Sequence, residues 1–116
     1  MTVRTVFVAV ALAAFVGLAA APAGAQTTPS FNCKKARTFV EREICGNPSL
    51  AAKDKRMSRL YFEQLSYYVE YGDTLETNAF KAEQRSWLAQ RDRCRTTQCL
   101  HVAYDSRIRQ LGQPLN

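Results

Sequence analysis

The chain has 116 residues, a formal net charge of +6 and four cysteines. This length fits a single domain with a small core. Gly-rich loops are absent and the basic excess is modest, so the composition does not indicate nucleic-acid binding.

The N-terminal residues have the pattern of a secretory signal peptide. Arg4 precedes an apolar run of 16 residues, Val6 to Ala21, and an Ala-x-Ala cleavage site ends at Ala25. The run is shorter than the roughly 20 residues that span a bilayer, which argues against a membrane anchor. No Cys lies near the cleavage point to carry a lipid. We therefore expect residues 1–25 to be removed, leaving a periplasmic or secreted protein without a lipid anchor or membrane contact.

The four cysteines indicate two disulfides, because small exported domains commonly need covalent cross-links. Three pairings are possible, and the short separations favour Cys33–Cys45 and Cys94–Cys99. A zinc site would have only Cys94, Cys99 and His101, three ligands at irregular spacing, and a redox role would favour the absent Cys-x-x-Cys motif. The sequence therefore predicts structural disulfides and no metal or other cofactor.

Residues 26–32 form a polar segment that we expect to be flexible, and residues 33–116 form the predicted domain. Thr38 and Glu41 have the spacing of a capping box at the start of a short helix from Phe39 to Cys45. Two helical turns are not stable alone in water, which gives the first disulfide a structural purpose.

A second helix is predicted from Pro48 to Tyr71, with Asn47 as its N-cap and Gly72 at its end. It has two apolar stripes about 100° apart around the helix axis, which implies contacts on two sides. The main stripe is Leu50, Met57, Leu60, Tyr61, Gln64, Tyr68 and Tyr71, and the second is Phe62, Leu65 and Val69.

Two further helices follow, the third capped by Asp73 or Thr74 and ending at Cys94, the fourth capped by Thr96 or Thr97 and ending before Gly112. Their stripes are Phe80, Gln84, Trp87, Arg91 and Cys94, and Leu100, Tyr104, Ile108 and Leu111. The fold class is all-α, a disulfide-linked bundle of three longer helices and one short N-terminal helix. The expected core includes Tyr61, Trp87, Leu88, Tyr104 and Ile108.

Two charged residues lie on or beside the apolar stripes, Asp54 on the second helix and Arg91 on the third. An unpaired buried charge is costly, so we expect the two side chains to pair across the helix interface.

The second apolar stripe is the predicted partner-binding surface. The short first helix has only about two turns and is expected to cover the stripe in part, leaving Val69 and the neighbouring Tyr67 exposed near the Gly72 turn. The predicted binding residues are Phe62, Leu65, Val69, Tyr67 and Tyr71.

Motifs along nearly the whole exported chain carry a family resemblance. They are Phe31-Asn32-Cys33, Thr38-x-x-Glu41-x-x-Ile44-Cys45, Leu50-x-x-x-Asp54, Tyr61, Gln84-Arg85-x-Trp87-Leu88-x-x-Arg91-Asp92-x-Cys94 and Cys99-Leu100-x-x-x-Tyr104-x-x-Arg107-Ile108. The chain resembles the bacterial LprI N-terminal domain family, named after a lysozyme-inhibiting member. The resemblance implies a helical, disulfide-linked envelope or secreted domain and inhibition of lysozyme.

An enzyme is not expected, because no motif joins a nucleophile to a base and the one His has no evident partner. The leading hypothesis is a noncatalytic inhibitor that blocks a lysozyme-type glycoside hydrolase. The chain after cleavage has 15 Lys and Arg against 10 Asp and Glu, so its net charge of +5 opposes long-range approach to a cationic lysozyme. The alternative is an envelope module that binds another protein or an anionic wall polymer.

Overall fold

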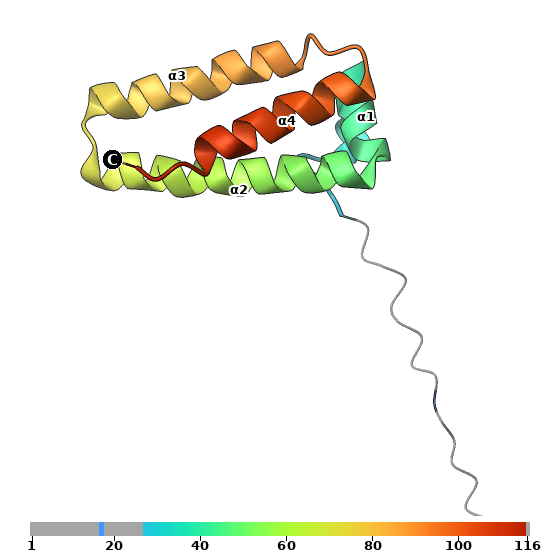
Figure 1. Ribbon diagram of the computed structural model, residues 1–116, viewed down its shortest axis with the longest axis horizontal. Helices are drawn as coiled ribbons and strands as arrows, with labels where there is room; N and C mark the ends of the chain where they lie inside the picture. Colours follow the sequence, from blue (N-terminus) through green and yellow to red (C-terminus); the bar gives the residue numbers. More distant parts are fainter. Residues whose placement is uncertain (1–16, 18–26, 116) are drawn as a thin grey trace, which may run out of the picture.

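A computed structural model describes Gly17 and residues 27–115. The elements are a 3-10 turn η1 (Cys33–Lys35), a short helix α1 (Phe39–Gly46) and three longer helices, α2 (Pro48–Tyr71), α3 (Thr74–Arg91) and α4 (Thr97–Leu111). The predicted all-α class is confirmed, with no strand in the part of the chain described (Figure 1).

Local sequence explains where the helices begin. Thr38 accepts a hydrogen bond from the backbone N–H of Glu41, whose carboxylate accepts from the N–H of Thr38, which completes the capping box of α1. Asn47 accepts from the first turn of α2, and Asp73 forms a second capping box with Glu76 at α3. Thr96 caps α4. These caps satisfy N–H groups that a helix leaves without partners.

The structure differs from the sequence predictions in several places. The third helix ends at Arg91, because the chain tightens into a turn over Asp92 to Cys94 and the Cys94–Cys99 disulfide follows directly. The 3-10 turn η1 was not predicted. Within the segment expected to be flexible, Pro29 is buried and Ser30 is hydrogen-bonded to α2, so this segment is attached to the helices.

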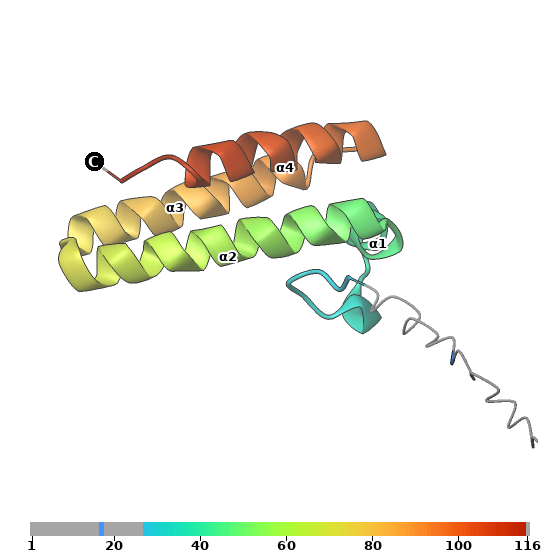
Figure 2. The ribbon, with the colours of Figure 1, turned by 60° about the horizontal axis from the view of Figure 1, so that its bottom comes forward.

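Helix α2 is the central element of the bundle. It pairs with α3 as an antiparallel hairpin, carries α1 at its N-terminal end and contacts α4 more extensively than α3 does (Figures 1 and 2). All four helices contribute buried apolar side chains. The core consists of Val40, Ile44, Leu50, Met57, Phe80, Trp87, Cys94, Leu100, Tyr104, Ile108 and Leu111.

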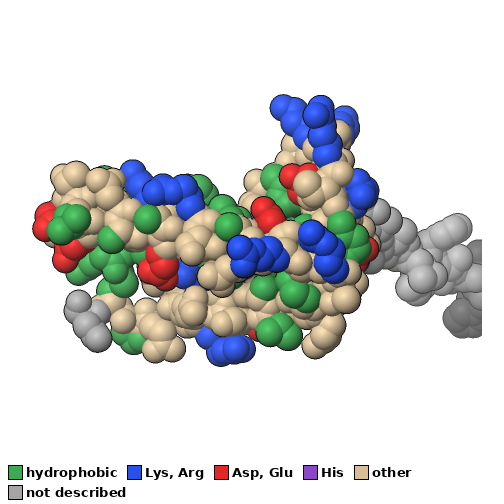
Figure 3. Space-filling view, turned by 90° about the horizontal axis from the view of Figure 1, so that it is seen from above, with side chains coloured by type: hydrophobic (Ala, Val, Ile, Leu, Met, Phe, Trp, Pro, Cys, Tyr) green, Lys and Arg blue, Asp and Glu red, His purple; other side chains and the backbone are tan. Residues whose placement is uncertain are grey.

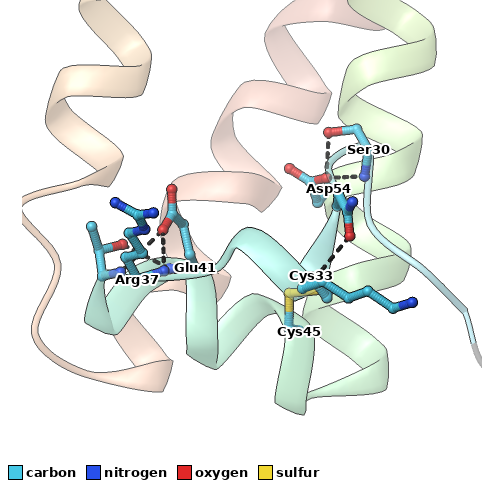
Figure 4. The surroundings of a disulfide bond; sticks show 9 residues. Ser30, Cys33, Arg37, Glu41, Cys45 and Asp54 are labelled. Carbon is cyan, nitrogen blue, oxygen red and sulfur yellow. Dashed lines mark hydrogen bonds between the residues drawn. A yellow bond between two sulfur atoms is a disulfide. The ribbon is translucent and has the colours of Figure 1, made fainter.

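Both disulfides lie at the α1 end of the bundle. Cys33 is bonded to Cys45 (Figure 4) and Cys94 to Cys99, the two pairs expected from their separations. The first holds η1 against the end of α1, and the second closes the turn between α3 and α4. Because both pairs are oxidised, neither Cys94 nor Cys99 is available as a thiolate ligand for zinc.

The predicted signal peptide, residues 1–25, lies outside the described residues except for Gly17. Within the described residues, no helix combines the length and apolar character needed to cross a bilayer.

Candidate functional site

The turn between α2 and α3 presents the largest group of exposed apolar side chains. Tyr71 is 68% exposed, Val69 64% and Leu75 78%, and Tyr67 is also exposed. We call this surface the hairpin tip: Tyr67, Val69, Glu70, Tyr71, Asp73, Leu75 and Glu76. Exposed apolar side chains edged by charged residues are typical of a protein-binding surface.

Helix geometry divides the predicted binding residues between two flanks of α2. At 100° per residue, Phe62 and Tyr71 lie on opposite sides of the helix, as do Val69 and Tyr67. Tyr67 and Tyr71 share one flank, where their ring centroids are 5.2 Å apart. Leu65 is half-buried against the core. The five residues therefore do not form one continuous stripe.

The expected cover by the first helix is also wrong for Phe62, which is 59% exposed. Helix α1 packs at the N-terminal end of α2, far along the helix from the hairpin tip (Figure 1). The two turns of α1 bury Val40 and Ile44 in the core instead of lying along the second stripe. Val69 and Tyr67 are exposed near the Gly72 turn, where we expected them to be.

Hydrogen bonds hold the hairpin tip in one conformation. The Asp73 carboxylate accepts from the N–H of Glu76 at 2.8 Å, and the Glu76 carboxylate accepts from the N–H of Asp73 at 3.1 Å. The Thr77 hydroxyl donates to the carbonyl of Tyr68 at 3.0 Å, which links α3 back to α2. A rigid loop loses less conformational entropy when it binds a partner.

The hairpin tip is acidic in an otherwise basic protein. Residues 60–80 contain Glu63, Glu70, Asp73 and Glu76 and no Lys or Arg, a net charge of −4. The rest of residues 26–116 has 15 Lys and Arg against six Asp and Glu, a net charge of +9. Figure 3 shows Asp and Glu at the end where the α2–α3 turn lies, and Lys and Arg with some Asp and Glu over the rest of this face.

Two of the tip side chains interact directly. The Glu70 carboxylate beside the Tyr71 hydroxyl raises the pKa of that phenol. The single O–H of Tyr71 therefore donates to Glu70.

A buried polar network lies at the other half of α2 and involves the predicted charge pair. Asp54 is 1% exposed and accepts hydrogen bonds from the N–H and hydroxyl of Ser30, each at 2.6 Å (Figure 4). Its other oxygen accepts from the Tyr104 hydroxyl at 2.7 Å and lies 3.8 Å from the Arg91 guanidinium. Arg91 also donates to Tyr104 at 3.2 Å and to Asp92 at 2.8 Å. Asp54 and Arg91 do meet, but Tyr104 lies between them and makes the shorter contacts.

The predicted core residues occupy two environments. Trp87, Tyr104 and Ile108 are buried, and Trp87 packs edge-on against Tyr104. Leu88 and Tyr61 are half-buried, because they line the groove between α2 and α3. Burial raises the pKa of the Tyr104 phenol, so this side chain is protonated and donates to Asp54.

A second buried charge was not predicted. Arg107 is 2% exposed, donates to the Gln84 amide oxygen at 2.9 and 3.0 Å, and pairs with Glu83 at 2.7 Å. Its position three residues after Tyr104 and four before Leu111 places it on the buried face of α4. That spacing is the signal from which its burial could have been inferred.

Neither buried network resembles a catalytic or metal centre. The carboxylates of Asp54 and Glu83 are bonded to donors from other elements, and no His lies in either network. In the described residues, no group of three or more His, Cys, Asp or Glu side chains is arranged to hold a metal ion. The hairpin tip offers exposed apolar, phenol and carboxylate side chains.

Comparisons with known proteins identify one relationship. A search of curated proteins and a search of solved structures return no match. The sequence profile of the family described as "Lysozyme inhibitor LprI" matches residues 32–112, which covers η1 and all four helices. The match spans well over half of the chain, so the chain belongs to the LprI lysozyme inhibitor family.

Proposed function

We propose that this protein is an exported, noncatalytic inhibitor of a lysozyme-type glycoside hydrolase, and that the hairpin tip is its contact surface. Family membership supports the activity. The observation that supports the location is the exposed, acidic and aromatic α2–α3 turn. Two disulfides suit an oxidising compartment outside the cytoplasm.

The charge distribution removes the main objection to this function. Animal lysozymes are commonly cationic, and a domain with a net charge of +5 is repelled by them at long range. Residues 60–80, which include the hairpin tip, have a net charge of −4, and salt limits each interaction to about 8 Å at physiological ionic strength. A cationic lysozyme that approaches the tip is therefore attracted by the nearby carboxylates. The more distant Lys and Arg side chains repel it only weakly, because salt screens them.

The side chains at the tip suit a lysozyme cleft. Such a cleft contains two carboxyl groups, which accept hydrogen bonds from donors. Tyr67 offers a hydroxyl donor, and the exposed rings of Tyr67 and Tyr71 can bury a large apolar area in a complex. Glu70 and Asp73 then face the cationic surroundings of the cleft, so the two parts of the tip have separate roles.

Inhibition assays with variants of the exported protein test this proposal. Tyr67→Ala and Tyr71→Ala should each weaken inhibition about tenfold or more, as expected for aromatic anchors of an interface. The matched control is Val102→Ala, which removes an apolar side chain that is 58% exposed on α4. It should leave inhibition unchanged, and all three variants should keep the melting temperature of the parent.

Full inhibition by a folded Tyr67→Ala, Tyr71→Ala double variant would show that the contact surface lies elsewhere. Failure of the parent protein to bind lysozyme in a pull-down would exclude the inhibitor function itself. The net charge of +9 outside residues 60–80 then favours the alternative, an envelope module that binds an anionic wall polymer.

A further inference from the structure

A groove lies between α2 and α3, and none of its lining residues belongs to α4. One part has a volume of about 330 Å³ and runs along facing sides of the two helices. An adjoining part of about 370 Å³ extends towards η1 and α1 and shares Ser30, Leu88 and Arg91 with the first. Figure 4 shows Ser30 beside α2, hydrogen-bonded to Asp54.

The apolar lining comes mainly from α2. Met57 and Tyr61 lie one turn apart on the same face of α2, with Leu88 opposite them on α3. Phe62, which neither the hairpin tip nor the core uses, adds an exposed aromatic side chain to the groove. Small-molecule sites are typically concave, mostly apolar and about 300–1,000 Å³ in volume.

The polar lining is cationic and partly without partners. Lys81, Arg85 and Arg91 line the groove from α3, and Asp54 is the one carboxylate in the same part. Asp54 is already bonded to Ser30 and Tyr104 and lies beside Arg91. Lys81 and Arg85 have no hydrogen bond or ion pair with any described residue. The groove therefore offers free donors and positive charge beside an apolar floor.

The larger concavity of the molecule lacks this combination. It lies between α2 and α4, with a volume of about 610 Å³. There Lys53 is already paired with Asp105 at 2.7 Å, and no aromatic side chain lines the wall.

We infer that the α2–α3 groove is a binding site for an anionic amphiphile, a small molecule with an acidic head and an apolar body. The head is held by Lys81 and Arg85, which lie one helical turn apart and reach the same side of the groove. The apolar body lies along Met57, Tyr61, Phe62 and Leu88. This site is separate from the hairpin tip and does not depend on lysozyme binding.

A fluorescence titration with 8-anilinonaphthalene-1-sulfonate, an aromatic anion, tests the site. The parent protein should bind the probe with saturation at one site. Lys81→Gln combined with Arg85→Gln should raise the dissociation constant about tenfold or more, since charge-assisted hydrogen bonds to the sulfonate are lost. The matched control is Lys55→Gln combined with Arg93→Gln, which removes the same charge from exposed positions outside the groove. It should change the dissociation constant of the probe by less than about twofold.

Two further measurements separate the acidic head from the apolar body. N-phenyl-1-naphthylamine has the same rings without the sulfonate and should bind more weakly than the anion, with no response to Lys81→Gln and Arg85→Gln. Decanoate, a carboxylate with an apolar tail, should displace the anionic probe. Phe62→Ala should weaken both aromatic probes without lowering the melting temperature, because Phe62 is mostly exposed.

Equal binding of the neutral and anionic probes would overturn the inference, since it would show an apolar surface without recognition of the head. Equal losses of affinity for the anionic probe in the groove variant and in the charge-matched control would also overturn the inference. Binding would then depend only on the net charge of the protein. Amide chemical-shift changes confined to the hairpin tip would place the probe elsewhere. Loss of lysozyme inhibition in the Tyr71→Ala variant has no bearing on these outcomes, so the two proposals fail independently.

Discussion

At the scale of single residues, Asp54 connects more of the structure than any other polar side chain. Its carboxylate joins Ser30 of the N-terminal segment, α2, and Tyr104 of α4, with Arg91 of α3 within 3.8 Å. All of these groups except Ser30 are buried or half-buried. A buried carboxylate with several donors is costly to remove, because the donors are left without partners.

We therefore predict that Asp54→Ala lowers the free energy of unfolding by about 3–5 kcal/mol. The control is Glu63→Ala, which breaks an ion pair with Arg59 at 2.8 Å between side chains that are both exposed. That change should cost less than about 1 kcal/mol. Urea denaturation of both variants measures the difference. Similar small losses would mean that the Asp54 network contributes no more than a surface pair.

The same network marks the limit of inference from the sequence. Helical spacing was sufficient to place Trp87 and Tyr104 in the core and to bring Asp54 towards Arg91, because each pattern lies within one helix. Spacing gives no information about Ser30, which meets Asp54 across 24 residues of chain. An interaction between a loop and a helix depends on tertiary structure, which cannot be predicted from residue spacing within one helix.

At the scale of elements, the helix caps were largely readable and the turns were not. Thr38 and Asn47 cap the helices that the sequence assigns to them, since a cap is set by neighbouring residues. The end of α3 at Arg91 depends on the Cys94–Cys99 bond and on the α3–α4 turn. The α2–α3 turn likewise depends on a close approach at Gly72, which the sequence alone does not show.

A substitution at Gly72 tests how tightly this turn is built. A Cβ atom there would lie 2.7 Å from the Tyr68 carbonyl oxygen, so the backbone must shift. We predict that Gly72→Ala lowers the free energy of unfolding by about 1–3 kcal/mol and weakens lysozyme inhibition, because the tip moves. Gly46→Ala is the matched control, since nothing lies within 4 Å of its Cβ position, and it should be neutral or slightly stabilising. Equal melting temperatures for the two variants would contradict the tight turn.

At the scale of the whole molecule, charge is separated along α2. The helix begins among basic residues and ends in the acidic tip. Lys53 and Tyr71 are 18 residues apart, which corresponds to about 27 Å along a helix. The negative end of the α2 macrodipole and the positive end of the α3 macrodipole meet at the tip and offset each other, so the separation comes from the charged side chains.

This separation predicts an unusual salt dependence for association with a cationic lysozyme. At about 0.01 M salt the screening length is about 30 Å, so the distant cations act and the net charge of +5 repels the enzyme. At about 0.15 M it is about 8 Å, so the tip attracts the enzyme while the distant cations are screened. At about 1 M it is about 3 Å, and the attraction by the tip is screened as well. The association rate constant should therefore rise and then fall as salt increases.

Stopped-flow association measurements across this range check the prediction. Glu70→Gln removes one tip carboxylate outside the capping box. It should lower the maximum of the association rate constant near about 0.15 M salt and leave the rate constant at about 1 M salt unchanged. Lys55→Gln removes one distant exposed cation and should raise the rate only at the lowest salt. If the rate instead fell steadily from the lowest salt upward, the distant cations would have no effect on the encounter. If it rose steadily to about 1 M, the enzyme would be meeting a cationic surface, and the acidic hairpin tip would not be the point of first contact.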